Sequence, residues 1–169
     1  KGEITVPGDK SVSHRAIMLG AIAEGVTRVS GFLEGEDTLA TARIFQQLGV
    51  RIETPSPSER IIHGVGLHGL KASNEDLDCG NAGTAMRLLT GLLAGQNFRS
   101  KLVGDASLSK RPMKRVIEPL SLMGASLQSE PNGLPPLIIN SKKTLQCINY
   151  TAAADSANVH SAILLRDLN

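Results

Sequence analysis

The segment SHRAIML at residues 13–19 returns near the other end of the chain as VHSAILL at residues 159–165. The two share the pattern His-x-Ala-Ile-x-Leu, and their histidines lie 146 positions apart, which is twice 73. Between them, GTAMRLL at residues 83–89 places Arg87 72 positions after Arg15. Similarity at one fixed spacing is typical of a structural unit that repeats. The sequence therefore predicts two full units of roughly 73 residues and the start of a third.

The first unit alternates between strand and helix patterns. Apolar residues at every second position predict strands, and apolar residues at helical spacing predict helices that begin after a polar cap and end at a glycine. The predicted strands are Ile4–Val6, Val26–Phe32, Val50–Glu53 (closed by Thr54 and Pro55) and Arg60–His63, and the predicted helices run from Ser11 or Ser13 to Gly25 and from Asp37 or Thr38 through Leu48 to Gly49.

The second unit repeats that order. It predicts a helix from about Ala82 to Ala94, a helix with Pro112 in its first turn that ends near Gly124, and a strand at Leu137–Asn140. Strands that alternate with helices at this spacing predict an α/β (α+β) fold of repeated βαβαββ units. The length of 169 residues suits a single domain, 1–169, predicted to be partial, with unit one at 1–72, unit two at 73–144 and the start of unit three at 145–169.

Composition excludes several classes of partner. The formal net charge is only +2, and one Tyr, three Phe and no Trp leave few rings for stacking on bases, so we expect no nucleic-acid partner. No apolar run approaches 18 residues, so we expect no membrane segment, and the first residues do not suggest a signal peptide. Cys79 and Cys147 form no CxxC pair, which favours a reduced, cytoplasmic protein without disulfides.

Three polar clusters are candidates for the functional site. The first is Pro7–Arg15, where Gly8 would let the backbone approach a ligand and Lys10 and Ser11 stand at a predicted helix start. Free N–H groups and the helix dipole favour anions at such a start. Arg15 follows Ser11 by four positions, about one helical turn, so both side chains can face one ligand.

The second and third clusters repeat the theme. In Gly80–Arg87, small residues again open a helix, and Arg87 occupies the place that Arg15 has in the first unit. In Gly104–Pro112, Arg111 precedes a proline and should therefore be extended, with a planar guanidinium that suits phosphate or carboxylate. Lys10, Arg15 and Arg111 are predicted to converge on one anion-binding crevice. The alternatives are ordinary capped helices, close helix–sheet packing at the glycines and a solvated surface turn.

Other motifs lack the flanking sequence that their known functions require. Gly64–Gly69 matches GxGxxG, but the polar segment that follows it is not helical, so no dinucleotide cofactor is expected. Ser107–Lys110 matches SxxK without the partner motifs of acyl enzymes. His63 and His68 lack a third ligand, so no metal is expected, and no pair of carboxylates at the clusters suggests a general acid and base. Cys79 is expected to be a buried, inert thiol.

Three motifs resemble those of 5-enolpyruvylshikimate-3-phosphate synthases, enzymes of aromatic amino-acid synthesis. They are PGDKSVSHR (Pro7–Arg15), GNAGTAMRLL (Gly80–Leu89) and GDASLSKRPM (Gly104–Met113), in that order, and the resemblance extends to about Leu165. It implies a fold of two domains, each of three βαβαββ units, that close over shikimate-3-phosphate and phosphoenolpyruvate. The present chain resembles most of one domain, with the second domain as its missing partner.

The resemblance also implies roles for individual residues. For shikimate-3-phosphate the implied binding residues are Lys10, Ser11, Arg15, Thr84, Ser156, Ala157 and Asn158, and for phosphoenolpyruvate they are Lys10, Asn81, Gly83, Arg111 and Asn158. No catalytic residue is expected in this chain, because the proton-transfer groups of the family belong to the other domain. The implied reaction adds a substrate hydroxyl to the enol carbon and releases phosphate, without a metal or organic cofactor.

The sequence departs from the family pattern near its end. Asn158 stands where the family has Gln, residues 153–155 replace the usual Pro-Met-Ala, and His160 stands where Lys is common. Two other functions remain open from the sequence: the related enolpyruvyl transfer to a UDP-sugar, and a stand-alone anion-binding module without catalysis. Alone, the chain is expected to be inactive.

Overall fold

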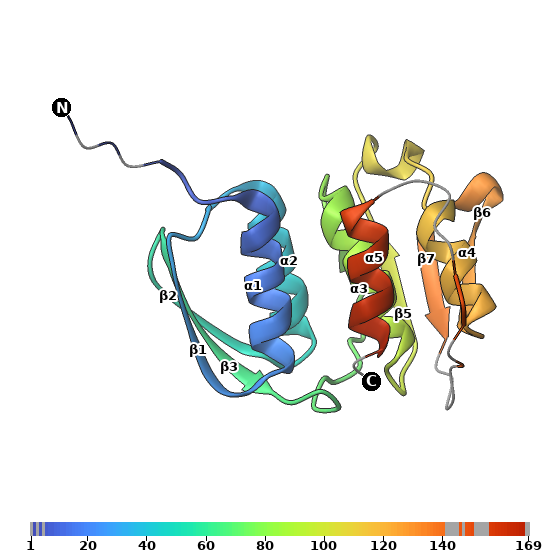
Figure 1. The fold of residues 1–169 in the computed structure, drawn as a ribbon, viewed down its shortest axis with the longest axis horizontal. Coiled ribbons are helices and arrows are strands. Elements are labelled where there is room, and N and C mark those ends of the chain that lie inside the picture. The colour runs from blue at the N-terminus through green and yellow to red at the C-terminus, as the bar shows by residue number, and fades with distance from the viewer. Residues whose placement is uncertain are drawn as a thin grey trace. The chain divides into compact units, whose positions relative to one another are not determined.

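Two compact units make up the chain, Lys1–Leu70 and Lys71–Asn169. Figure 1 shows them in a computed structural model that describes residues 2, 4, 6–140, 146, 148–150 and 156–167. Each unit has its own sheet covered by helices, and each is described by itself. Among the predicted features, Cys147, residues 153–155 and Thr5 lie outside the described residues.

In unit 1, two helices cover a three-stranded antiparallel sheet whose order is β1-β3-β2. The elements are α1 (Lys10–Ile22), β1 (Glu24–Ser30), α2 (Glu36–Gln47), β2 (Arg51–Ser56) and β3 (Glu59–Val65). The core is formed by apolar side chains of both helices and the central strand, among them the fully buried Ile17, Ile44, Phe45 and Ile62. This packing fixes the start of α1 beside the start of α2.

Glycines let α1 lie directly on the sheet. A Cβ atom at Gly64 of β3 would lie 2.1 Å from the carbonyl oxygen of Ala23 and 2.6 Å from that of Gly20. Backbone oxygens cannot yield to such a contact, so only glycine fits there. The glycine that the sequence presents inside a GxGxxG pattern therefore serves helix–sheet packing.

In unit 2, a four-stranded sheet has the order β4-β5-β7-β6. Its strands are β4 (Leu77–Asp78), β5 (Ser100–Val103), β6 (Ser126–Glu130) and β7 (Leu134–Asn140), and its helices are α3 (Gly83–Ala94), α4 (Lys114–Leu122) and α5 (Ala157–Asp167), with short 3-10 turns at Leu108–Lys110 and Pro131–Gly133. β4 and β5 are parallel, whereas β7 is antiparallel to both β5 and β6. The segments that follow β4 and β5 therefore leave the sheet at the same end.

Helix α5 belongs to unit 2 and lies against α3 (Figure 1). A Cβ at Gly91 of α3 would lie only 1.9 Å from the carbonyl oxygen of Ala162 in α5. Val159, Ala162 and Leu165 are buried side chains of α5, and their spacing places them on one helical face. This close approach fixes Ser156 and Asn158, at the start of α5, within unit 2.

The predicted order of elements is confirmed from α1 onward, with shifts at the ends. In place of Ser11 or Ser13, the cap of α1 is Asp9, and α2 begins after Gly35. The sequence places the end of α1 at Gly25, but the helix ends at Ile22, and Gly25, with a φ of 88°, lies inside β1. β2 runs through Pro55, which was expected to close it, because β2 is at the edge of its sheet and needs no N–H there.

At the chain's start, the described Ile4 and Val6 lie in no strand, although alternation predicts one. Ile4 and Val6 are both exposed, so they do not form the buried apolar face that stabilises a strand in a sheet. None of the helices in the described part of the chain is long and apolar enough to cross a membrane.

Candidate functional site

Asp9 organises the start of α1. Its carboxylate accepts a hydrogen bond from the backbone N–H of Val12 at 2.7 Å, as an N-cap does. Ser13 donates to the carbonyl oxygen of Asp9 at 2.8 Å and accepts from the backbone N–H of Leu33 at 3.0 Å, so this serine ties α1 to the loop before α2. The expectation that Ser11 or Ser13 caps the helix is therefore wrong, because the aspartate two residues earlier satisfies the free N–H.

The role predicted for Gly8 is also wrong. A Cβ there would lie 1.9 Å from the carbonyl oxygen of Gly31, so the chain itself occupies the space that was assigned to a ligand. Gly8 is needed because the segment before α1 crosses the loop after β1 at backbone contact distance.

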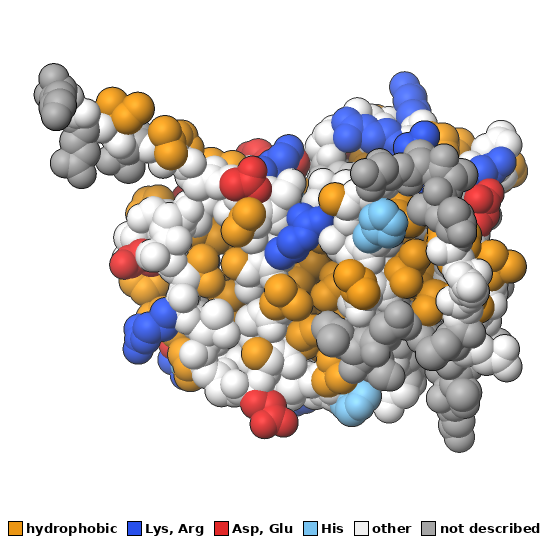
Figure 2. All heavy atoms as spheres, viewed as in Figure 1, with side chains coloured by type: hydrophobic (Ala, Val, Ile, Leu, Met, Phe, Trp, Pro, Cys, Tyr) orange, Lys and Arg blue, Asp and Glu red, His pale blue; other side chains and the backbone are white. Residues whose placement is uncertain are grey.

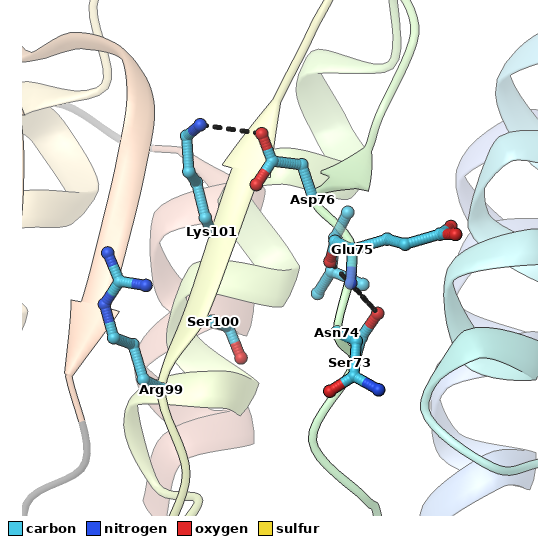
Figure 3. A pocket seen from close by; sticks show the side chains of 8 residues that line it. Ser73, Asn74, Glu75, Asp76, Arg99, Ser100 and Lys101 are labelled. Carbon is cyan, nitrogen blue, oxygen red and sulfur yellow. Dashed lines mark hydrogen bonds and ion pairs between the residues drawn. The ribbon is translucent and has the colours of Figure 1, made fainter.

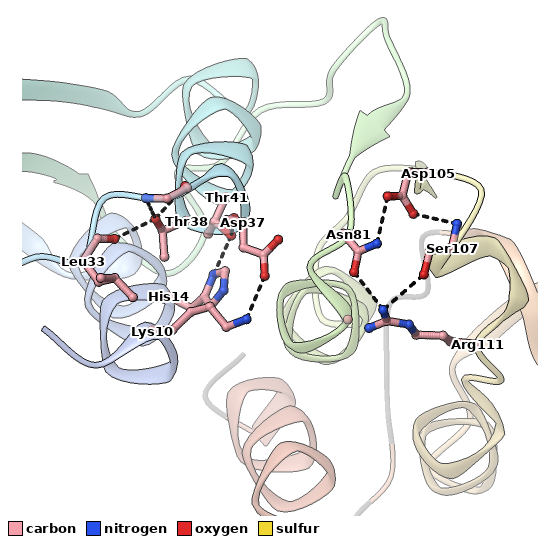
Figure 4. Close-up of polar contacts among 12 residues, drawn as sticks. Lys10, His14, Leu33, Asp37, Thr38, Thr41, Asn81, Asp105, Ser107 and Arg111 are labelled. Atoms are coloured by element: carbon pink, nitrogen blue, oxygen red, sulfur yellow. Dashed lines mark hydrogen bonds and ion pairs between the residues drawn. The ribbon is translucent and has the colours of Figure 1, made fainter. Parts of the chain in front are cut away.

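Lys10 projects from the first turn of α1 toward α2 (Figure 4). Its ammonium group lies 2.9 Å from the carboxylate of Asp37, and the Lys10 side chain remains 54% exposed. Exposed ion pairs of this kind are worth about 1 kcal/mol or less, so the contact orients Lys10 without locking it. An incoming anion can therefore compete with Asp37 for this cation.

Arg15 lies one turn further along α1. Its guanidinium donates to the carbonyl oxygen of Ser11 at 3.2 Å. Ser11 and Arg15 are both half-buried, and they share one side of the helix as their spacing predicts. Lys10, Ser11 and Arg15 are thus together on the first two turns of α1.

His14 is fully buried between α1 and α2. Its Nδ1 lies 2.8 Å from Thr41 Oγ1, while its Nε2 has no partner among the described residues. Thr41 Oγ1 also donates to the carbonyl oxygen of Asp37 at 3.3 Å, so it accepts from His14, which leaves Nε2 as a buried acceptor. The pKa of His14 is lowered to about 4, chiefly by burial and to a lesser degree by the charges of Lys10 and Arg15, while the charge of Asp37 opposes the shift.

In unit 2, the loops after β4 and β5 are joined by a network of side chains (Figure 4). Arg111 donates to the amide oxygen of Asn81 at 2.8 Å and to Ser107 Oγ at 3.2 Å. The amide nitrogen of Asn81 donates to the carboxylate of Asp105 at 2.8 Å. Two predicted site residues, Asn81 and Arg111, are therefore in direct contact, although 30 positions separate them.

Asp105 holds this network in shape. Its other carboxylate oxygen accepts from the backbone N–H groups of Ser107, at 2.9 Å, and Leu108, at 2.7 Å. The hydrogen bond from Leu108, followed by that from Asn81, lowers the pKa of Asp105, so it stays ionised. Sequence reasoning missed this role, yet an Asp two and three positions before the N–H groups it binds is a recognisable turn signal.

Gly83 begins α3 between two guanidinium groups. A Cβ at this position would lie 3.0 Å from Nη1 of Arg87 and 3.6 Å from Nη1 of Arg111. Arg87 donates to the carbonyl oxygen of Gly83 at 3.1 Å, and Thr84 is the next, half-buried residue of α3. Burial, and after it the charges of Arg111 and Arg115, lower the pKa of Arg87.

Cations gather at this end of unit 2. Figure 2 shows Lys and Arg side chains over the segment from the end of β5 to the first turn of α4, and the exposed ones there are Lys110, Arg111, Lys114 and Arg115. Arg111 has the extended backbone that was predicted for the residue before Pro112, with φ −95° and ψ 117°. α4 begins two residues later than Pro112, at Lys114.

Ser156 and Asn158 lie at the start of α5, where the carbonyl of Ser156 accepts from the N–H groups of Val159 and His160. Both side chains line a cavity of about 460 Å³ together with Arg87, Lys114 and Arg115. Ala157 is exposed beside them. The predicted residues of unit 2 thus occupy the starts of α3 and α5 and the loop before α4.

A second hollow, of about 80 Å³, lies at the opposite ends of β4 and β5 (Figure 3). The ammonium of Lys101 lies 2.7 Å from the carboxylate of Asp76 there, and Glu75 and Arg99 are also part of the lining. Because its charges offset one another, this hollow does not favour an anion. Cys79 is buried, and burial raises the pKa of its thiol, as expected for an inert cysteine. The described residues contain no group of three or more His, Cys, Asp or Glu side chains that could hold a metal ion.

Comparisons with known proteins all point to one family. Residues 1–169 match the family model of EPSP synthase (3-phosphoshikimate 1-carboxyvinyltransferase). The 3-phosphoshikimate 1-carboxyvinyltransferase of Xanthomonas campestris pv. campestris (strain B100) is 60% identical over 168 residues, and that of Xanthomonas axonopodis pv. citri (strain 306) is 59% identical. The matched part is 99% of this chain and 38% of each relative.

A solved structure agrees. EPSP synthase from Acinetobacter baumannii superposes with a TM-score of 0.94 at 57% identity, over 98% of this chain and 38% of that one. The α/β (α+β) fold class predicted from the sequence is confirmed. The chain spans about two fifths of the length of the relatives it matches.

Proposed function

Because the chain belongs to the EPSP synthase family, we propose that it supplies the part of a 3-phosphoshikimate 1-carboxyvinyltransferase that holds the charged groups of shikimate-3-phosphate and phosphoenolpyruvate. The observation that carries the proposal is the contact of Arg111 with Asn81 beside the start of α3. It supports a rigid anion site, because Asp105 fixes Asn81 and Asn81 in turn aims the guanidinium of Arg111.

The reaction would join the two substrates and release phosphate. A hydroxyl of shikimate-3-phosphate would lose its proton to a base of the second domain as its oxygen bonds to the enol carbon of phosphoenolpyruvate. The electrons of the double bond would take up a proton at the methylene carbon, which becomes a methyl group. Loss of a proton from that methyl group and departure of phosphate then regenerate the double bond. Arg111 and Lys10 would stabilise the negative charge of the leaving phosphate, and fixed cations of this kind lower barriers without moving themselves.

The remaining roles follow the family's motifs. Ser11 and Arg15 on α1 and Thr84, Ser156, Ala157 and Asn158 in unit 2 would hold shikimate-3-phosphate, while Lys10, Asn81, Gly83, Arg111 and Asn158 would hold phosphoenolpyruvate. The groups that move protons would come from a second domain, the partner of this one. A cytoplasmic location, expected from the cysteine content, belongs to the same proposal.

A chimera tests this function. The segment of the Acinetobacter baumannii enzyme that this chain matches is replaced by the chain, and phosphate release is measured with both substrates. We expect turnover from the chimera, and loss of most of it on Arg111→Met. The exposed Arg99→Met, at the other end of β5, is the matched control and should keep the rate. A folded chimera that releases no phosphate would refute the proposal.

A further inference from the structure

Arg60 of β3 is a buried cation to which neither the motifs nor the proposed function give a role. Its side chain is only 1% exposed. Its guanidinium donates, at 3.0, 3.2 and 2.7 Å, to three carbonyl oxygens at the turn between β2 and β3, those of Ser56, Pro57 and Glu59. Burying a charge costs free energy, and a buried ion pair often stabilises a fold no more than apolar side chains of similar size. Stability alone therefore does not explain an arginine here.

Arg60 also joins this turn to the loop between β1 and α2, residues 31–35. Its Nη2 lies 2.6 Å from the carboxylate of Glu34. The centre of the guanidinium lies 4.2 Å from the centroid of the Phe32 ring, which is a cation–π contact. The backbone N–H of Phe32 donates to the carbonyl oxygen of Ser58 at 2.9 Å. Arg60 thus holds loop 31–35 by a charge and by a ring.

The other side of this loop supports the start of α1. A Cβ at Gly8 would lie 1.9 Å from the carbonyl oxygen of Gly31, so the two segments touch through their backbones. The backbone N–H of Leu33 donates to Ser13 Oγ at 3.0 Å. Lys10 lies between these two contacts in the sequence. The loop therefore determines where the first turn of α1 lies, and with it the ammonium group of Lys10.

The same loop holds the start of α2, which carries Asp37, the partner of Lys10 (Figure 4). The fully buried Thr38 donates through Oγ1 to the carbonyl oxygen of Leu33 at 2.7 Å and accepts from the backbone N–H of Gly35 at 3.0 Å. Both members of the Lys10–Asp37 ion pair therefore rest on one loop.

We propose that Arg60 is a positioning residue of the phosphoenolpyruvate site, which keeps the ammonium group of Lys10 in place through loop 31–35. The inference rests on the proposed function and extends it to a residue outside the three motifs. Arg60 itself contacts no substrate, because its effect passes through Glu34 and Phe32. A guanidinium suits the position because its planar fork meets three carbonyl oxygens and a carboxylate at once, which the compact ammonium of a lysine cannot do.

The test follows the labelled chain by NMR, with phosphoenolpyruvate titrated in the presence of shikimate-3-phosphate. Arg60→Met removes the guanidinium. Glu34→Gln keeps the shape of a side chain that is 37% exposed and removes only its charge, so it decides alone if Arg60→Met does not fold. Arg28→Met is the matched control, because Arg28 is an exposed cation of β1 outside loop 31–35. Amide exchange at Leu33 reports on the loop without any ligand.

We expect Arg60→Met and Glu34→Gln each to speed amide exchange at Leu33 at least fivefold and to weaken phosphoenolpyruvate binding at least fivefold. Arg28→Met should change neither quantity. In a chain that also carries Lys10→Met, the same two substitutions should change the affinity less than twofold, because their effect passes through Lys10. A residue that serves only the fold would not show this dependence on Lys10.

Three results would overturn the inference and leave the proposed function standing. They are an unchanged affinity in the folded variants, an unchanged exchange rate at Leu33, and an equal loss of affinity with and without Lys10→Met. If the wild-type chain binds no phosphoenolpyruvate, the proposed function fails, and the inference fails with it.

Discussion

Gly83 is the residue at which one added methyl group should change the site most. In Gly83→Ala the new Cβ would lie 3.0 Å from Nη1 of Arg87 and 3.6 Å from Nη1 of Arg111, so a guanidinium must move. Both neighbours are ends of flexible side chains, and alanine is favoured over glycine in a helix, so the fold should not suffer. We expect an unchanged or higher melting temperature.

The same variant should bind phosphoenolpyruvate about tenfold more weakly, which corresponds to about 1.4 kcal/mol and to the loss of one charge-assisted hydrogen bond. Thermal unfolding and titration calorimetry on one preparation separate the two effects. A variant that binds as tightly as the wild type would show that the space between the two guanidiniums is not the anion site.

His14 should make stability depend on pH. The histidine titrates near 6.5 in an unfolded chain and at about 4 in the folded protein. Below pH 6.5 the unfolded chain therefore binds a proton that the folded chain refuses, and stability falls as the pH drops from 6.5 to 4. The full loss from this group is at most about 3 kcal/mol.

Urea unfolding at pH 7 and pH 4.5 measures this loss. His14→Asn keeps a polar group near Thr41 but removes the titration, so its stability should fall less over the same interval. His68→Asn, at an exposed position, is the control and should fall as much as the wild type. Equal losses in all three proteins would contradict this account of His14.

Motifs predict which residues form the candidate site but not which partners hold those residues in place. Lys10, Asn81 and Arg111 follow from the sequence, because each stands in a cluster of small and basic residues. The partners of these residues, Asp37 and Asp105, lie 27 and 24 positions away from the groups they bind, so their roles depend on tertiary packing. The burial of His14 likewise depends on where α2 lies.

At the scale of elements, the order of helices and strands is easier to predict from the sequence than the residues at which they begin and end. The alternation of apolar periods predicts α1, α2, α3 and the strand β7, whereas the helix ends depend on Asp9 and Gly35, which compete with nearby residues of similar type. Gly91 illustrates a feature that no periodicity reveals, because it lies inside the apolar helix α3 and is required only by the approach of α5.

Gly91→Ala should therefore displace α5. Its Cβ would meet the carbonyl oxygen of Ala162 at 1.9 Å, and backbone cannot yield as a side chain does. We expect a loss of about 1–3 kcal/mol, typical of overpacking, and faster amide exchange in α5. Gly20→Ala in α1 is the contrast: its Cβ would meet only side-chain atoms, the Cδ1 of Ile62 at 3.0 Å and the Cβ atoms of Thr27 at 3.3 Å and Ile62 at 3.4 Å, so shifts of a few tenths of an ångström relieve the contact. Unchanged exchange in α5 for Gly91→Ala would disprove the packing argument.

At the scale of the molecule, the proposed function divides the reaction between this chain and a second domain. It spans 38% of its relatives, and α1 leaves Val12 64% and Leu19 48% exposed. We expect no detectable phosphate release from the purified chain with both substrates, because the proposed function assigns the groups that move protons to a second domain. Robust turnover by the chain alone would contradict the proposed division of labour.

The convergence of Lys10 and Arg15 with Arg111 stays a prediction of the sequence, and it is the central claim of the proposed function. Titration of the labelled chain with shikimate-3-phosphate, followed by NMR, tests it most directly. We predict that amides of residues 10–15 and of residues 83–87 shift along one saturable curve with a single dissociation constant, and that the shifts diminish at high salt. Shifts confined to one of the two segments, or two curves with different constants, would contradict a shared site.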